Sequence, residues 1–553
     1  MLTPEYLEAA PEGMVELYSK LDEAIIRDIV RRMVKTGGVT SSAAWQAGRL
    51  QESGLLYDDI VRQVSNLTGS STAQVQSLFS DAGIDALKYD FAIYEAAGLA
   101  PIPLRQSPAA AQVLRAGIQK TQGYLKNLSL TTAATSQQAY IQAVTAAEMQ
   151  VESGAFDYVT AIRNAVRDTA QAGTTVLYPT GHKDKLDVAV RRAVLTGVGQ
   201  TTGKIEERYA DDMGCDLVET TAHPGARPSH MLWQGKVFSR SGSGKYPDFV
   251  ASTGYGTGPG LCGWNCRHSF FPFFEGVSES AYPRGKLREY ENKRVRYNDQ
   301  PLPYYDATQM QRGMERQIRA TKRELAGYSE GMKSDDEGIR NAMRESFSDS
   351  SVRLKRQEAK LKDFLQQTGL DRQNEREQVL GFSRSQAQSA RQSAEKRYHQ
   401  WVYGIGADDV APKTLANYYT EKYNDSPAYE LLKGYGKAVD SGEISPLVGL
   451  KQYTDVAHDI ESGIVGITTA TGVEIQSYTT HFTDRIIGQV STPHPGKRLG
   501  VPIEDAKDAL LHPQKLGELR TLDDGDTRQT LYGEKATVTV SVRDKRLIQT
   551  NPR

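Results

Sequence analysis

Residues 17–29 read LYSKLDEAIIRDI. The apolar side chains of this stretch recur at every fourth position, at Leu17, Leu21, Ile25 and Ile29. This spacing is typical of an α-helix that buries one side and exposes the other. The sequence remains rich in Ala, Gln, Leu and Lys to about residue 175. We therefore expect a mainly α-helical front over residues 1–175.

Short polar turns are expected to divide this front into several helices. Ser71-Thr72, for example, precede the apolar residues Val75 and Leu78 and predict the cap of a new helix. No His or Cys occurs before His182, so the front has few residues suited to catalysis. The expected role of residues 1–175 is attachment to a larger assembly.

The composition of the chain excludes several classes of protein. Among 553 residues, 67 Lys and Arg balance 68 Asp and Glu, so the chain would not coat nucleic acid by charge alone. No stretch approaches the roughly 20 apolar residues of a membrane helix, and the first residues lack the pattern of a signal peptide. Three cysteines are too few for a multi-bridge disulfide scaffold. We expect a soluble, multidomain protein of a reducing compartment.

Residues 176–300 differ from the front, because Gly, Pro and aromatic residues increase and all three cysteines gather there. This predicts a small α/β domain with a Cys/His cluster. In an extended chain Cys266 and His268 share a face, and a turn at Gly263 would bring Cys262 beside them. Zinc prefers four tetrahedral N and S ligands, and His230 or His223 would complete the set. The candidate metal ligands are Cys262, Cys266, His268 and His230, and the predicted cofactor is a structural zinc. The alternative is a group of buried thiols and hydrogen-bonded histidines without metal.

Residues 301–402 are highly charged, and their apolar stripe is narrow. Long helices that pack on each other or on a partner are one interpretation, and a solvated helical spacer is the other. A linker with short helices is predicted for residues 403–462.

The tail, residues 463–553, predicts a small α+β domain. Thr471-Gly472 between two apolar stretches indicates a hairpin. Two helices should follow, the first of them capped by Thr479-Thr480, and then an antiparallel meander. The strand over 535–542 alternates apolar residues with hydroxyl residues, so one face should be buried and the other polar.

The tail also contains candidate catalytic residues. His481 and Arg485 are four positions apart and lie on the same side of a helix. Metal-free RNA cleavage needs a base, an acid and cations for the developing phosphorane charge. His481 would be base or acid, Arg485 would hold phosphate, and hydroxyls would come from Thr537 and Thr539. Arg528 and Lys535 are the candidate RNA-binding residues. An ordinary surface His–Arg pair is the alternative, since spacing alone establishes no cleft.

Several blocks of the first 400 residues resemble the phage minor capsid protein 2 family, which is related to Mu-type head morphogenesis proteins. The blocks are residues 21–29, 45–50, 220–230 with 233–236, 260–268 with 272–276, and 309–319. The resemblance implies a virion protein present in few copies, located inside the phage head near the portal, and in the host cytoplasm during assembly. It implies contacts with portal and capsid proteins and a role in head assembly or early DNA delivery.

The tail resembles the phage nuclease-like domains of the barnase–EndoU–colicin–RelE fold group, through residues 465–467, 480–486, 503–513 and the last two strands. This resemblance implies a metal-independent ribonuclease or toxin domain that needs no cofactor, with a cognate immunity protein as a further partner. His481 and Arg485 match the His and Arg of the group, and Thr537 and Thr539 both remain open as its hydroxyl residue. The alternative is an inactive module that binds RNA or protein.

Overall fold

The computed structural model describes residues 1–553 except 36–42, 380–381, 425 and 490–497. The chain folds into two compact units, residues 1–390 and residues 391–553. The first unit is built almost entirely of helices, with three small sheets, and the second combines helices with one larger sheet. The five-part domain division expected from the sequence stays a prediction beside these two units.

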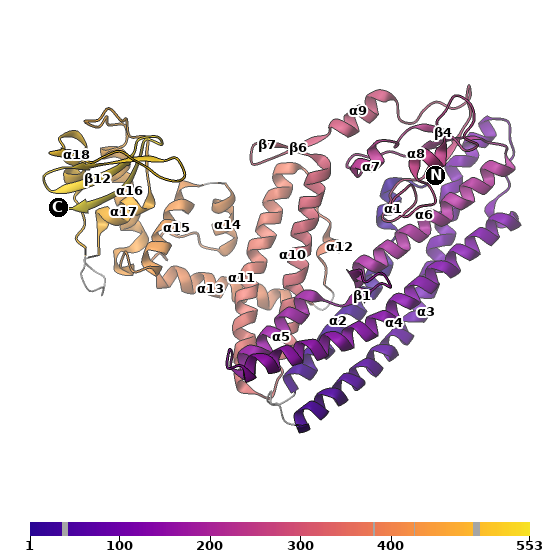
Figure 1. Cartoon of the computed structure of the whole chain (residues 1–553), viewed down its shortest axis with the longest axis horizontal. Helices are drawn as coiled ribbons and strands as arrows, with labels where there is room; N and C mark the ends of the chain where they lie inside the picture. The colour runs from indigo at the N-terminus through magenta and orange to yellow at the C-terminus, as the bar shows by residue number, and fades with distance from the viewer. Residues whose placement is uncertain (36–42, 380–381, 425, 490–497) are drawn as a thin grey trace. The chain divides into compact units, whose positions relative to one another are not determined.

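Long helices form the front of the first unit, and Figure 1 shows α3 and α4 running side by side in it. The first five helices are α1 (Pro4–Ala9), α2 (Glu12–Lys35), α3 (Ala43–Ala96), α4 (Pro108–Glu152) and α5 (Tyr158–Ala172). The predicted helix cap at Ser71-Thr72 is wrong, because α3 continues through it. The Ser71 hydroxyl donates instead to the carbonyl of Thr68 at 3.0 Å, so it is satisfied inside the helix.

The helix α2 buries three of the four apolar residues predicted to line its buried side, whereas the fourth, Leu17, is half-buried. Leu21, Ile25 and Ile29 are at most 4% exposed and belong to the main core of the unit. This face lies against α3, α5, α6 (Leu186–Asp212) and α10 (Tyr304–Gly331). Burial of each such side chain contributes about 1.5–3 kcal/mol, so this apolar stripe is the main force holding α2 in place.

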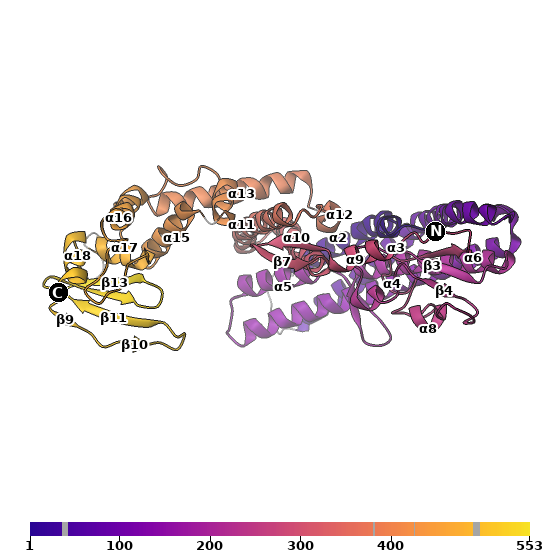
Figure 2. The same ribbon diagram turned by 90° about the horizontal axis from the view of Figure 1, so that it is seen from above.

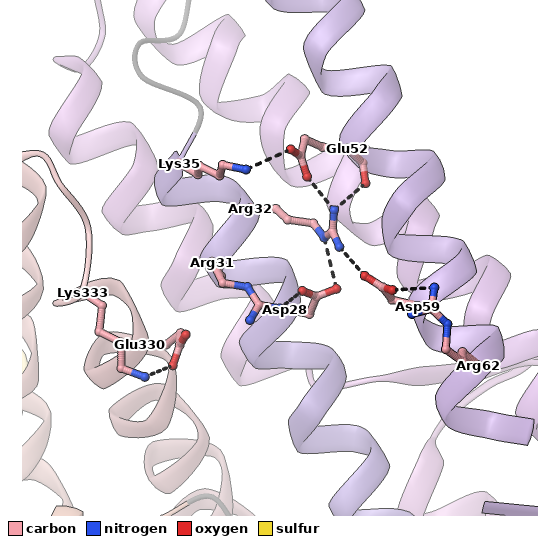
Figure 3. Close-up of polar contacts among 9 residues, drawn as sticks. All are labelled: Asp28, Arg31, Arg32, Lys35, Glu52, Asp59, Arg62, Glu330 and Lys333. Atoms are coloured by element: carbon pink, nitrogen blue, oxygen red, sulfur yellow. Dashed lines mark hydrogen bonds and ion pairs between the residues drawn. The ribbon is translucent and has the colours of Figure 1, made fainter. Parts of the chain in front are cut away.

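An ion-pair cluster joins the C-terminal half of α2 to α3 (Figure 3). The guanidinium of Arg32 donates to Asp28 at 3.1 Å, to Glu52 at 2.5 Å and to Asp59 at 2.7 Å. Asp28 is only 3% exposed, so its charge needs compensation by cations, and it has two of them, Arg32 and the more exposed Arg31. Arg62 pairs with Asp59 from the solvent side, at 3.2 Å.

The middle of the first unit carries its three small sheets. The central one has the antiparallel order β4-β3-β5, and the other two are the hairpins β1-β2 and β6-β7. The elements are β1 (Thr175–Leu177), β2 (Lys183–Lys185), β3 (Leu217–Thr220), α7 (Pro228–Met231), β4 (Val237–Ser239), α8 (Phe249–Thr253), β5 (Phe270–Phe273), α9 (Arg284–Asn292), β6 (Arg294–Tyr297) and β7 (Gln300–Pro303). A separate apolar cluster fills the space around β3 and β5 and includes Trp233, Cys262 and Cys266.

The long charged helices are α10 and α11 (Glu337–Thr368), and they pack against each other. Ile318 and Leu325 of α10 and Ile339 of α11 are fully buried in the main core. Of the two interpretations offered by the sequence, the structure confirms packed helices, and the solvated spacer is wrong. The short α12 (Asn374–Glu377) and α13 (Arg384–Gly404) follow.

The second unit begins within α13 and ends in the six-stranded sheet shown in Figure 2. The strand order is β10-β11-β12-β13-β8, and β9 pairs with β11. Among the described strands of this sheet, only the β13–β8 pair is parallel. The elements are α14 (Leu415–Tyr423), α15 (Pro427–Asp440), α16 (Gly449–Gly463), β8 (Ser477–Tyr478), α17 (Thr480–Ile487), α18 (Ile503–Leu511), β9 (Lys515–Leu516), β10 (Arg520–Thr521), β11 (Thr527–Tyr532), β12 (Ala536–Ser541) and β13 (Arg546–Pro552). The predicted two helices and antiparallel meander are confirmed, as is the Thr479 cap, which accepts from the amide of Phe482. The predicted hairpin is present only as a turn with a single antiparallel bridge between Thr468 and Glu474, without paired strands.

The core of the second unit joins the sheet to α16 as well as to α17 and α18. Val538 and Val540 of β12 pack on the same cluster as Ile460 of α16 and Phe482 of α17. Ile460 is completely buried. The hydrophobic core therefore starts before residue 463, where the sequence placed the beginning of the tail domain.

Within the described ranges, no helix combines the length and the apolar character needed to cross a membrane.

Candidate functional site

A candidate metal centre lies beside the central sheet of the first unit. His230 is on α7, and Cys266 and His268 are on the loop that leads into β5. Hydrogen bonds fix this loop to the end of β3, because the amide of Thr221 donates to the carbonyl of Ser269 and the amide of Ser269 donates to the hydroxyl of Thr221, both at 2.9 Å. The sheet thus brings together two segments that are 36 residues apart in sequence.

Three ligand atoms converge at this place. The two Nδ1 atoms of His230 and His268 lie 3.3 Å apart, and the Sγ atom of Cys266 lies 3.8 and 3.6 Å from them. In a tetrahedral zinc site, with Zn–N of about 2.0–2.1 Å and Zn–S of about 2.3 Å, such atoms would be separated by roughly 3.3 and 3.6 Å. The observed spacing therefore suits a tetrahedral metal ion, and the three residues could hold one.

The hydrogen bonds on the far side of each ring determine where its free lone pair points. His230 donates through Nε2 to the carbonyl of Pro259 at 2.9 Å, and His268 donates through Nε2 to Oε1 of Gln234 at 3.1 Å. The backbone amide of His223 donates to the same Gln234 atom at 3.1 Å, so this atom is the amide oxygen and not the amide nitrogen. In the neutral rings both Nδ1 atoms are consequently unprotonated. Metal-ligating histidines are usually oriented by outer-shell acceptors in this way.

Burial keeps these groups neutral. All three side chains are about 2% exposed, and desolvation lowers the pKa of His230 to about 4 and that of His268 well below its ordinary value. Desolvation also raises the pKa of the Cys266 thiol. A bound metal cation would favour the thiolate form of Cys266, so the thiol would lose its proton when the metal binds. Metal affinity would therefore depend on pH.

Cys262, the fourth predicted ligand, lies outside the converging group. Its backbone has a positive φ of 58°, and its Sγ atom faces α6, where a Cβ placed on Gly203 would lie 3.4 Å away. His223, the other residue considered, stacks on the ring of His268 with centroids 4.5 Å apart. The structure thus brings together three of the four predicted ligands, Cys266, His268 and His230.

The tail residues predicted to be catalytic are partly assembled in the second unit. Nε of Arg485 donates to Nε2 of His481 at 3.2 Å, and Nη1 of Arg485 donates to the Oδ1 atom of Asn551 at 3.2 Å. Asn551 lies opposite Thr537 in the β12–β13 register, and the Thr537 hydroxyl donates to its carbonyl at 3.4 Å. His481, Arg485, Asn551 and Thr537 therefore form one continuous chain of hydrogen bonds, in which Asn551 was not predicted.

His481 is neutral in this arrangement. Burial and then the charge of Arg485 lower its pKa, and because Nε2 accepts from Arg485, the ring proton is on Nδ1. The Nδ1 atom faces Oδ2 of Asp484 at 3.7 Å. A neutral imidazole beside a guanidinium is a suitable pair for a base and a phosphate-binding cation.

The remaining predicted tail residues have other partners. The Thr539 hydroxyl lies 3.0 Å from that of Thr530, and Nε of Arg528 donates to Asp526 at 2.6 Å. The ammonium of Lys535 is largely exposed, 3.8 Å from a carboxylate oxygen of Asp505. None of these contacts connects the three residues to His481.

The comparison with protein families concerns the first unit. Residues 2–366 match the family model described as Phage minor capsid protein 2. A structural protein of Lactococcus phage LL-H is 31% identical over 170 residues, which are 29% of this chain and 43% of that protein. A structural protein of Lactococcus phage mv4 is 32% identical over 141 residues, 25% of this chain and 95% of that protein.

The chain thus spans less than half the length of the first relative and nearly all of the second. No solved structure matches. The matched range includes His230, Cys266 and His268 and stops before the tail. Because the family model covers well over half of the sequence, the chain belongs to the phage minor capsid protein 2 family.

Proposed function

We propose that the first unit is a structural module of the phage head, located inside the head near the portal and present in few copies. The observation that carries this proposal is that the family match, residues 2–366, falls within one compact unit, residues 1–390. Both curated relatives are named structural proteins. The module would contact portal and capsid proteins, and it would be found in the host cytoplasm while heads are assembled.

Zinc, bound by His230, Cys266 and His268, is the metal that suits the centre best, because the ligands are two imidazoles and one thiol. Its role would be structural. The loop that contains Cys266 and His268 also holds the N-terminal segment, since the Ser269 hydroxyl donates to the carbonyl of Leu2 at 2.6 Å and Arg267 pairs with Glu8 of α1. A metal there would fix α7, this loop and α1 together.

Analysis of purified virions tests the placement in the head. Mass spectrometry of DNA-filled particles should detect the chain at a few copies per particle. Particles from which the phage tail has been removed should retain it, if the chain lies in the head. Absence from mature particles, or loss together with the phage tail, would contradict the proposal.

A second function, a metal-independent ribonuclease in residues 463–553, is favoured by the hydrogen-bond chain His481–Arg485–Asn551–Thr537. An RNA phosphate would compete for the guanidinium of Arg485, and this would release the lone pair on Nε2 of His481. The free nitrogen would then take the proton of a 2′-hydroxyl, whose oxygen attacks phosphorus while the bond from phosphorus to the 5′-oxygen breaks. The leaving 5′-oxygen would take a proton from the protonated His481 or from water, and Arg485 would stabilise the negative charge on the phosphorane oxygens.

An inactive module that binds RNA or protein is the alternative for the tail domain, and an immunity protein would be a partner only of the active form. Comparison of RNA cleavage by the full chain and by its His481→Ala variant separates the two.

A further inference from the structure

A cavity of about 580 Å³ opens beside the metal centre in the first unit. It is bordered by the His230–His268 side of the centre, by α1, by α6 and by α10. Nine Lys and Arg side chains and four carboxylates line it, an excess of five positive charges. The whole chain carries a net charge of only −1, so this cavity is a strong local concentration of cations.

The carboxylates in the cavity do not neutralise these cations one by one. Glu8 is shared, because it pairs with Arg267 and also with Arg376, the latter at 2.7 Å. Arg312 makes no hydrogen bond or ion pair with any residue that the structure describes. Asp187 is shared likewise, because it pairs with Arg319 at 2.6 Å and lies 3.5 Å from Arg323. The Nε atom of Arg319 has no hydrogen-bond partner in the described part of the chain.

The positive charges in the cavity lie close enough to lower one another's pKa. Burial, followed by the charges of Arg376 and Arg267, lowers the pKa of Arg312 to about 10. Burial and Arg376 also lower the pKa of Arg191. Positive charges held together in a partly buried space are costly unless an anion compensates them.

We propose that this cavity binds a compact ligand with two or three phosphate groups, the class that includes nucleoside triphosphates and inorganic polyphosphate. Guanidinium groups match phosphate oxygens in paired hydrogen bonds, and Arg312 has its donors free for such bonds. The volume lies in the range of small-molecule sites, about 300–1,000 Å³, and a nucleic-acid duplex would not fit into it.

Titration calorimetry of the full chain tests the proposal, with inorganic tripolyphosphate as one probe and ATP as the other. We expect saturable binding of about one probe per chain, weakened at least tenfold by Arg312→Gln. The matched control Arg288→Gln, which removes an exposed cation of α9, should leave binding unchanged. Tighter binding of ATP than of tripolyphosphate would identify the ligand as a nucleotide, and equal binding would identify it by its phosphates alone.

A variant without a metal ligand separates phosphate binding from metal binding. Binding should persist in Cys266→Ser, which removes a metal ligand, since the arginines hold the phosphates. Should Arg312→Gln fail to fold, Arg316→Gln at the exposed edge of the cavity replaces it. Three results would overturn the proposal: no saturable binding, binding lost in Cys266→Ser but kept in Arg312→Gln, or tighter Arg312-dependent binding of a single-stranded oligonucleotide than of either probe.

Discussion

The Nδ1 atom of His230 faces the Nδ1 atom of His268 across 3.3 Å, and neither carries a proton in the neutral rings. Two lone pairs at this distance repel each other unless a cation lies between them. The Sγ atom of Cys266 lies 3.8 and 3.6 Å from these two nitrogens, so the three atoms would occupy three corners of a tetrahedron around a bound ion. This arrangement is the physical reason to propose a metal site in the first unit.

The ion-pair cluster between α2 and α3 should be important for stability. Replacing Arg32 by Met removes the cation shared by Asp28, Glu52 and Asp59 and leaves Asp28 paired with the more exposed Arg31. We therefore expect a loss of up to about 3 kcal/mol, the lower end of the range for a broken buried pair. Calorimetric scans should therefore show a clearly lower melting temperature for the first unit. Arg62→Met is the matched control, because Arg62 is 73% exposed and pairs with the same Asp59, and we expect it to change stability by less than about 1 kcal/mol. Equal effects of the two substitutions would contradict the assigned role of Arg32.

Truncation should show where the second unit begins. A fragment of residues 391–553 retains α16 and should unfold cooperatively, whereas a fragment of residues 463–553 lacks Ile460, which is fully buried in the shared core. The shorter fragment also loses the hydroxyl of Tyr453, which donates to Asp484 at 3.0 Å. Circular dichroism and thermal melting of both fragments check this. Cooperative unfolding of the shorter fragment would show that α16 is dispensable.

The sequence predicted features that depend on local spacing. The four-residue period of Leu17, Leu21, Ile25 and Ile29 was sufficient to identify α2, and three of these four residues lie on its buried side. The helix cap predicted at Ser71 is wrong because a hydroxyl residue caps a helix only where the helix begins. Inside α3 the same hydroxyl donates to a carbonyl of the preceding turn.

Features that depend on tertiary register were not predictable. Cys266 and His268 are two positions apart and share a face locally, but the φ of 58° that turns Cys262 toward α6 has no signal in the sequence. Asn551 reaches Arg485 only through the β12–β13 register, which contains an irregularity between Thr539 and Val540. Neither the turn nor the register can be read from composition or periodicity.

The buried carboxyl of Asp484 should make the second unit pH-dependent. Burial raises its pKa to about 6 from an ordinary value of 3.8, so between these values the folded state binds more protons than the unfolded state. Stability then falls as pH rises through this window, by roughly 3 kcal/mol in full. The charged or titratable groups around it are Glu443, His481, Arg485 and Arg498.

Asp484→Asn removes this titration and keeps an acceptor for Tyr453. The melting temperature of the variant should rise relative to that of the natural chain as pH increases from 4 to 7. Asp459→Asn, which changes an exposed carboxylate of α16, is the control and should give a constant difference. A constant difference for Asp484→Asn as well would show that the carboxyl is charged throughout.

Ribonuclease activity, if the tail domain has it, should depend on His481. Incubation of the full chain with RNA in the presence of EDTA should give products with 2′,3′-cyclic phosphate ends. His481→Ala should reduce the rate by about 100-fold or more, the usual contribution of a general base. His512→Ala, which removes an exposed histidine of the same unit, should leave the rate unchanged. No cleavage by the natural chain would favour the inactive binding module, and equal cleavage by His481→Ala would place the active residues elsewhere.

The metal content of the purified full chain tests the central claim most directly. Elemental analysis should find about one zinc per chain, lost in Cys266→Ser and retained in Cys215→Ser, where the substituted thiol is buried in a different cluster. Absence of metal from the natural chain, or the same zinc content in Cys266→Ser, would contradict the assignment of His230, Cys266 and His268 as a metal centre.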